Sequence, residues 1–288
     1  MPLRIVTDST ADLPHALASE LAICVVPVNV QFGEESFRDG VDISSTEFFR
    51  RLEQAEQLPT TSQPSAGAFR AAYEALIADG ATEILSIQVS EKLSGTAESA
   101  RQGARGLDGA RIEVLDSATV SAALCLAVTH AARCAAAGCS LDDTLAAVRG
   151  QLSRTRLLFM VDTLEYLRRG GRIGRARELM GSLLRIKPIL EVRDGEVAPL
   201  GRARTRRRGI DELLDLAADL RPIEHAMVFD ATTPEDREYL ADRIRGYAEG
   251  APVIVGTLGP AIGVHAGPGT LGLAVVTSQE PSPPASGP

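Results

Sequence analysis

Three polar segments of this 288-residue chain carry the side chains that are able to do chemistry. Residues 58–65 hold two threonines and two serines, and residues 93–96 read Leu-Ser-Gly-Thr. Residues 259–269 place His265 among glycines and prolines. Hydroxyls, backbone amides freed by glycine and a histidine are donors that suit holding a small anion. They predict a carboxylate or phosphate site more than a centre for difficult chemistry.

Each of these residues also has an ordinary structural interpretation. The hydroxyls of residues 60–62 are explained as loop polarity, and Ser65 as the cap of the helix that follows. A lone histidine is more often a hydrogen-bonded core residue than a ligand contact. A second hydroxyl segment favours a binding site. Residues 94–96 again place hydroxyls next to a glycine, at the junction between a predicted strand and a predicted helix. Two helix N-termini of this kind attract one anion.

The alternative is a serine-dependent hydrolase acting on an acyl ester or thioester. Ser62 or Ser94 would then react with the help of His265, although the chain has no Gly-x-Ser-x-Gly elbow. Its four histidines are scattered without ligand spacing, which predicts no metal site. Residues 267–272 match G-x-G-x-x-G, but they lead into a strand-like run instead of a helix. We expect a glycine turn there, and no nucleotide or other cofactor.

Composition bounds the class of protein. A length of 288 residues favours two domains, and 44% hydrophobic with 24% charged residues is typical of a globular protein. The net charge of -8 argues against nucleic acid as a partner. The four cysteines lack metal spacing, which indicates free thiols in a reducing compartment. We see neither a signal peptide nor an apolar run near the ~20 residues of a membrane span, so we expect a cytoplasmic protein without stable membrane insertion.

The first half alternates strands with helices. Strands are expected at residues 3–7, 23–32, 83–89 and 111–115, with helices at 14–21, 44–55, 65–79, 94–107, 120–137 and 140–153. This alternation predicts a parallel sheet in a three-layer α/β/α domain over residues 1–154. Ligands of such sheets bind beyond the carboxyl ends of the strands, where Asp8, Ser90 and Asp116 fall.

The second half has a different style. Residues 186–192 and 196–200 flank Arg-Asp-Gly, which is a hairpin signal among further helices and strands. We therefore expect an α/β domain with a mixed sheet over residues 155–278, followed by a disordered tail, 279–288. Between positions 168 and 208 the sequence has twelve arginines and one lysine but only four acidic residues. This basic surface suits an acidic or phosphate-bearing partner, with Arg202, Arg204 and residues 206–208 the most exposed.

In order along the chain, several motifs together resemble the DegV family of bacterial fatty-acid-binding proteins. They are Val-Thr-Asp-Ser-Thr-Ala-Asp-Leu-Pro at 6–14, Thr-Ser-Gln-Pro-Ser at 61–65, Leu-Ser-Gly-Thr at 93–96, Asp-Ser at 116–117, Asp-Thr-Leu-Glu-Tyr-Leu-Arg-Arg-Gly-Gly-Arg-Ile-Gly at 162–174, Lys-Pro at 187–188 and Gly-Val-His-Ala-Gly-Pro-Gly at 263–269.

The resemblance implies a non-enzymatic lipid carrier with a long-chain fatty acid, for example palmitate, between two α/β domains. It implies that the hydroxyls of Thr61 and Ser94 bind the carboxylate, with His265 close by and Ser62, Gly95 and Thr96 in support. It also implies that a separate fatty-acid kinase phosphorylates the bound acid, and that Arg202 and Arg204 belong to its docking face. Hydroxyls and a histidine hold a carboxylate without a tight ion pair, so we expect no arginine clamp at the head group.

Overall fold

A parallel sheet forms the first half of the chain. The computed structural model describes residues 3–181 and 186–278. Its first sheet has the strand order β2-β1-β6-β7, and every neighbouring pair is parallel. The strands are β1 (Leu3–Asp8), β2 (Cys24–Val26), β6 (Glu83–Gln88) and β7 (Arg111–Asp116). The expected parallel sheet is confirmed.

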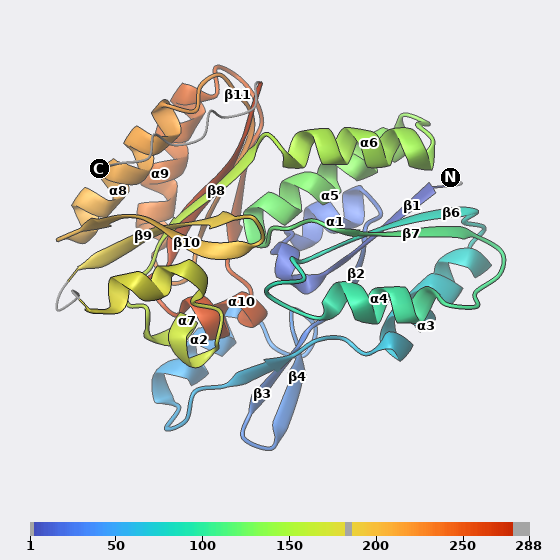
Figure 1. Cartoon of the computed structure of the whole chain (residues 1–288), viewed down its shortest axis with the longest axis horizontal. Coiled ribbons are helices and arrows are strands. Elements are labelled where there is room, and N and C mark those ends of the chain that lie inside the picture. Colours follow the sequence, from blue (N-terminus) through green and yellow to red (C-terminus); the bar gives the residue numbers. More distant parts are fainter. Residues whose placement is uncertain (1–2, 182–185, 279–288) are drawn as a thin grey trace.

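Helices cover both faces of this sheet (Figure 1). One face packs against α3 (Ala66–Ala78) and α4 (Thr96–Ala104), and the other against α5 (Ser121–Ala136) and α6 (Leu141–Leu152). Side chains alternate across a strand, so in β6 Ile84 packs under α3 while Leu85 packs under α5. Serines cap α3 and α6 by accepting a backbone N–H three residues on. The three-layer arrangement follows directly from this period of two.

The second sheet is mixed, with the order β10-β9-β8-β13-β11-β12. The strands are β8 (Thr155–Met160), β9 (Lys187–Arg193), β10 (Glu196–Ala203), β11 (Ile223–Asp230), β12 (Val253–Thr257) and β13 (Leu271–Thr277). The predicted hairpin is β9 with β10, and only β11 and β12 are parallel neighbours in this sheet. Leu158 and Met160 of β8 pack beneath α8 (Arg206–Ala218) and α9 (Pro234–Tyr247), while Leu157 and Phe159 face the first half of the chain.

A third, three-stranded antiparallel sheet corrects two sequence predictions. The run 23–32, predicted as one strand, divides at Pro27 into β2 and β3 (Asn29–Phe32), which lie in different sheets. The segment predicted as a polar turn contains β5 (Thr60–Ser62), which pairs with β3. Its three polar residues show no apolar alternation, and only the exposed edge of β3 makes them a strand.

The remaining elements join these sheets. They are the short helix η1 (Ser9–Ala11), α1 (His15–Glu20), β4 (Glu35–Arg38), α2 (Ser45–Gln54), α7 (Glu165–Arg169), η2 (Gly174–Gly181) and α10 (Pro260–Ala266). Sequence analysis did not predict α10, which begins at a proline after Gly259 and ends at Gly267 with φ 78°. The following residues lead into β13, so the expected glycine turn is confirmed. In Figure 1, α10 lies where the two halves of the molecule meet.

Two expectations concern the chain as a whole. The predicted disordered tail, 279–288, lies outside the described residues. Across residues 3–181 and 186–278, none of the helices combines the length and the apolar character that crossing a bilayer requires.

Candidate functional site

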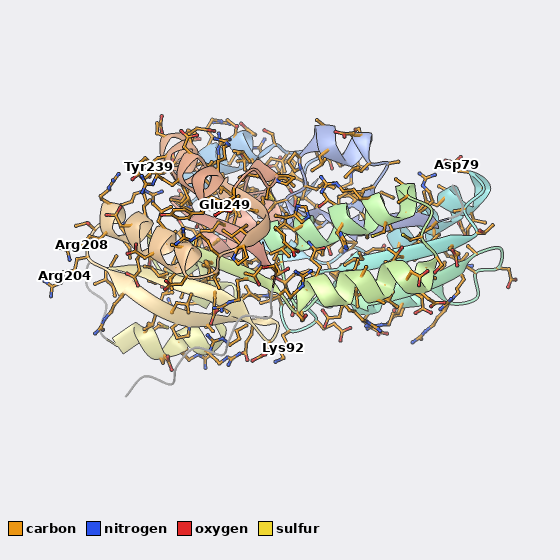
Figure 2. All side chains as sticks on the ribbon, turned by 90° about the horizontal axis from the view of Figure 1, so that it is seen from above. Asp79, Lys92, Arg204, Arg208, Tyr239 and Glu249 are labelled. Atoms are coloured by element: carbon orange, nitrogen blue, oxygen red, sulfur yellow. The ribbon has the colours of Figure 1, made fainter. Side chains whose placement is uncertain are left out.

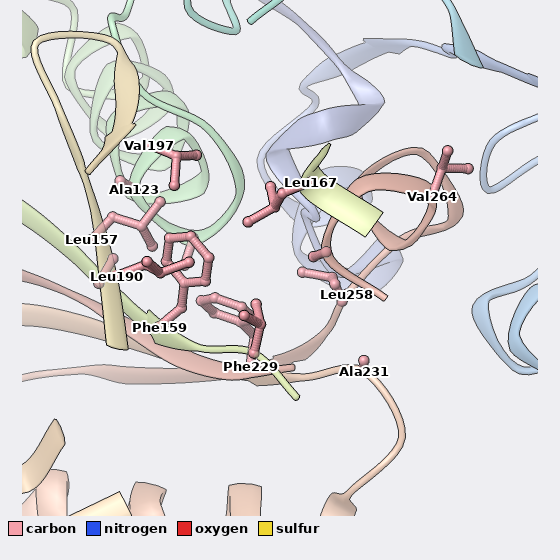
Figure 3. Packing of buried hydrophobic residues seen from close by; sticks show 14 of the residues in the cluster. Ala123, Leu157, Phe159, Leu167, Leu190, Val197, Phe229, Ala231, Leu258 and Val264 are labelled. Atoms are coloured by element: carbon pink, nitrogen blue, oxygen red, sulfur yellow. The ribbon is translucent and has the colours of Figure 1, made fainter. Parts of the chain in front are cut away.

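An apolar cavity of about 410 Å³ lies between the first and second sheets. Its size falls in the range of about 300–1,000 Å³ that is usual for small-molecule sites. Figure 3 shows Phe159 and Phe229 of the second sheet on the side of the sheet where Leu167 of α7 lies, and all three residues line the cavity. The apolar lining includes Leu157, Phe159, Leu167, Val197, Phe229 and Leu258.

The first half of the chain contributes residues that directly follow its parallel strands. Thr10, Val89 and Val120 line the cavity just beyond β1, β6 and β7. The cavity therefore lies at the carboxyl ends of the strands, where parallel sheets bind ligands and where sequence analysis expected a site.

Thr61 and His265 meet at one end of this cavity, although 204 positions separate them in the sequence. The Thr61 Oγ1 and His265 Nε2 atoms are 2.9 Å apart. β5 supplies the threonine and α10 supplies the histidine. Burial, with a smaller contribution from the Arg172 charge, lowers the pKa of His265 to about 4, so the imidazole is neutral at physiological pH.

The other ring nitrogen of His265 faces the end of α7. Nδ1 is buried and accepts or donates no hydrogen bond within the described residues. A Cβ added to Gly170 would lie 2.1 Å from Nδ1, so only glycine allows the chain to approach the ring this closely. Among residues 3–181 and 186–278 no carboxylate orients this ring, which distinguishes the arrangement from a serine-histidine-aspartate triad.

Ser94 and Ser62 line the same cavity as Thr61. The Ser94 hydroxyl is 2.8 Å from that of Thr96, which is fully buried behind it at the start of α4. Ser94 therefore bonds to a neighbouring hydroxyl and has no hydrogen bond to His265 among those of the described residues. Thr96 positions Ser94 without itself lining the cavity.

Gln63 joins the two hydroxyl segments, and sequence analysis gave it no role. Its Nε2 donates to Ser99 Oγ at 2.9 Å, and its side chain lies against Gly95. A Cβ at Gly95 would be 2.4 Å from Gln63 Oε1. Gly95 is therefore needed for close approach, and the strand carrying Thr61 is held against the start of α4.

Arg172 also lines the cavity, and sequence analysis had given this residue no place in the site. Its Nε donates to the Leu93 carbonyl at 3.0 Å and its Nη1 to the Gly170 carbonyl at 2.7 Å. It makes none of the ion pairs found among the described residues. Arg172 stands in the 162–174 motif, but nothing in the sequence distinguishes it from the eleven other arginines between positions 168 and 208.

A second hollow, of about 540 Å³, meets the cavity at this end. Thr61, Arg172 and His265 line both spaces. Beyond them the hollow is lined by Pro59, Tyr166 and other residues of the β5 and α7 segments. The cavity thus has an apolar interior and a polar mouth. We call the Thr61, Ser94, Arg172 and His265 side chains the head-group cluster.

The two arginines expected to contact a partner lie away from the cavity lining. Arg202 and Arg204 are exposed, and neither pairs with a carboxylate of the described residues. In Figure 2, Arg204 and Arg208 project from the end of the molecule opposite Asp79. Arg206 was expected to be exposed, but it is mostly buried and bonded to Asp236 and to the Gly269 carbonyl.

In the part of the chain that the structure describes, no group of three or more His, Cys, Asp or Glu side chains is arranged to hold a metal ion. The four cysteines are free thiols. Thr10, Ser121 and Thr270 add further hydroxyls to the cavity lining.

Fold and site together define an α/β protein of three sheets that encloses an apolar cavity with a polar mouth. The sequence model of one family, described as "Uncharacterised protein, DegV family", matches residues 2–278. DegV domain-containing proteins of Halalkalibacterium halodurans and Streptomyces coelicolor are each 37% identical to the chain, over 94% and 95% of its length and 97% and 98% of theirs. The chain belongs to the DegV family.

Solved structures agree with this assignment. A fatty-acid-binding DegV family protein from Thermus thermophilus is 34% identical and superposes with a TM-score of 0.88, covering 96% of this chain and 100% of that one. DegV of Bacillus subtilis, also described as a fatty acid binding protein, is 30% identical with a TM-score of 0.88 and the same coverage. The resemblance seen in the sequence motifs is confirmed, and so is the expected α/β fold with a parallel sheet and a separate mixed sheet.

Proposed function

We propose that this protein is a non-catalytic carrier that binds a long-chain fatty acid, such as palmitate, between domains at residues 1–154 and 155–278. The acyl chain occupies the apolar cavity and the carboxylate lies at the head-group cluster, with Ser62, Gly95 and Thr96 in support. The observation that carries the proposal is the arginine at the mouth. Arg172 is a cation beside an apolar cavity, and no carboxylate of the described residues neutralises it.

Elementary energetics support a fatty acid. About sixteen buried methylenes at ~0.8 kcal/mol each give roughly 13 kcal/mol before the costs of association. A buried carboxylate without partners would forfeit several kcal/mol. The head-group cluster supplies hydroxyl donors and one positive charge, which meets this requirement.

Lipid mass spectrometry of the purified protein tests the proposal. Extraction under denaturing conditions is expected to release about one fatty acid per chain. Protein that is empty, and that also rejects added fatty acid in a titration, would overturn it. Hydrolysis of an acyl ester that is lost in His265→Ala would instead favour the hydrolase.

The carrier's proposed partner is a separate kinase that phosphorylates the bound carboxylate to an acyl phosphate in the cytoplasm. The open mouth supports this, because the second hollow gives a route to the head group. Arg202 and Arg204 are unpaired cations of the described surface and suit an acidic partner face. Charge reversal at both is expected to reduce phosphorylation while fatty-acid affinity stays unchanged.

Arg243→Glu is the matched control, because Arg243 is an exposed arginine on α9 of the same half of the chain. Equal phosphorylation of the Arg202/Arg204 double variant and the control would place the docking surface elsewhere. Loss of fatty-acid affinity in the double variant would show that the substitutions act through the cavity.

A further inference from the structure

Asp12 ties the starts of two helices together. Its side chain is 8% exposed. Oδ1 accepts the backbone N–H of Gly259 at 2.8 Å, and Oδ2 accepts the Ser121 hydroxyl at 2.5 Å. Gly259 caps α10 and Ser121 begins α5. One buried carboxylate, on the residue that follows η1, therefore links the first half of the chain to α10.

Asp39 is a second buried carboxylate beside the start of α10. It follows β4, is 4% exposed, and its carboxylate lies close to the start of α10, with Oδ1 3.4 Å from the position of a Cβ built on Gly259. Its Oδ2 also accepts the Ser9 hydroxyl at 2.7 Å, and that hydroxyl in turn accepts the Val28 N–H at 3.0 Å. Asp12 and Asp39 thus approach the first turn of α10 from two different segments of the first half.

The surroundings of the two carboxylates are unusual for structural aspartates. Neither makes an ion pair with any described residue. Burial raises the pKa of Asp12 to about 8 and that of Asp39 to about 7. Asp12 (φ 49°) and Ser121 (φ 53°) both occupy the left-handed backbone region, which costs non-glycine residues free energy. Surrounding contacts must hold this strained, poorly solvated arrangement together.

α10 is the element that this arrangement serves. Ala261 and His265 lie one helical turn apart on the cavity side of α10. On the other side, a further hollow of about 770 Å³ is lined by Asp12, Asp39, Gly259 and Pro260. The start of α10 therefore lies between two hollows, where fewer apolar side chains pack against it. Its contacts with the two carboxylates hold it in place there.

We infer that Asp12 and Asp39 are positioning residues of the head-group cluster. By holding the first turn of α10 against the first half of the chain, they keep the His265 imidazole desolvated and beside Thr61. The inference rests on the proposed fatty-acid site for its functional meaning. Its physical content, the placement of His265, does not depend on any ligand.

Amide hydrogen exchange of the unaltered protein gives the first test. The N–H group of Gly259 is expected to exchange only through large-scale opening, at a rate close to those of the β13 core. Exchange as fast as that of a surface loop would overturn the inference without any substitution.

Substitution gives the second test, read by NMR titration of the imidazole signals. His265→Gln assigns the His265 signal. In Asp12→Ala and Asp39→Ala, the pKa of His265 is expected to rise from about 4 toward the ordinary value near 6.5, because the ring gains solvent. Asp12→Asn keeps an acceptor for Gly259 and resembles the neutral acid, so it is expected to leave the His265 pKa near 4.

Asp230→Ala is the matched control. Asp230 is 2% exposed and accepts the N–H of Thr233 at the start of α9, so it is a buried aspartate at a helix start within one half of the chain. This variant is expected to lower the melting temperature without moving the His265 pKa. An unchanged His265 pKa in folded Asp12→Ala and Asp39→Ala would overturn the inference, and so would loss of the low pKa in Asp12→Asn.

Ligand binding separates this inference from the proposed function. Asp12→Ala and Asp39→Ala are expected to weaken binding of a fatty acid by at least about tenfold, and binding of the matching fatty alcohol by less. If the unaltered protein binds no fatty acid, the proposed function fails while the imidazole titration still decides whether the aspartates position His265. Equal losses for acid and alcohol would show a general effect on the cavity and would overturn the positioning role.

Discussion

Thr61→Val is the sharpest perturbation of the head-group cluster, because it exchanges a hydroxyl for a methyl of nearly the same size. In the empty protein it removes the 2.9 Å bond to His265 Nε2. Nδ1 already lacks a partner, so both ring nitrogens are then unsatisfied, at a cost of about 1–3 kcal/mol of folding stability. In the complex it removes, in addition, the hydrogen bond that the hydroxyl donates to the charged carboxylate, which is worth about 1.5–3 kcal/mol. At 1.4 kcal/mol per tenfold, fatty-acid affinity falls about 10- to 150-fold.

Calorimetric titration with a fatty acid and with the alcohol of the same chain length measures this effect. The alcohol forms only a neutral hydrogen bond, worth about 0.5–1.5 kcal/mol, so its loss stays near tenfold or below. Thr60→Val is the control, since Thr60 precedes Thr61 on β5, is exposed and bonds to Gln31 instead of His265. An unchanged acid affinity in Thr61→Val, or an effect as large in Thr60→Val, would refute the assignment.

Three further predictions follow from the site. Arg172→Gln should weaken fatty-acid binding by about 10- to 100-fold and remove most of its salt dependence, measured by titration at two ionic strengths. The pKa of His265 is about 4 in the folded protein and 6.5 in the unfolded chain, so its contribution to stability is present above pH 6.5 and is lost as the pH falls toward 4. In His265→Gln, the free energy of unfolding measured in urea should therefore change less between pH 6.5 and 4, by up to about 3 kcal/mol. Folding raises the pKa of Asp12 from 3.8 to about 8, so the folded protein loses stability relative to the unfolded chain as the pH rises between these values. Asp12→Asn should therefore be more stable than the unaltered protein at pH 8, by a larger margin than at pH 5. An equal margin at the two pH values would contradict the raised pKa.

The period of the apolar residues was sufficient to predict most of the fold. Runs such as Ile84 to Ile87 alternate between two buried faces, and serine caps mark the starts of α3 and α6. What the sequence could not reveal was β5 and α10. β5 is three polar residues that become a strand by pairing with β3, and α10 is a glycine-rich segment whose start depends on Asp12, 247 positions away.

The same distinction explains which site residues could be predicted. The hydroxyls of Thr61 and Ser94 were recognisable because they stand at strand and helix junctions, and the structure places both on one cavity. Arg172 was missed although it stands in the 162–174 motif, because only the folded structure shows which of the many arginines lacks a carboxylate partner among the described residues. Gln63 was missed for a related reason, since its contact with Gly95 exists only after the two segments meet.

The electrostatics of the mouth bear on how a carrier can both hold and release its ligand. Arg172 carries one positive charge. Burial at the same mouth lowers the pKa of His265 and keeps its imidazole neutral. A protonated imidazole would add a second positive charge beside a carboxylate and strengthen the complex at a low effective dielectric constant. In the proposed complex, a neutral histidine and two hydroxyls would satisfy the head group by hydrogen bonds and a single ion pair. The apolar cavity would then dominate affinity, and the proposed kinase would reach the carboxylate from the side of the second hollow.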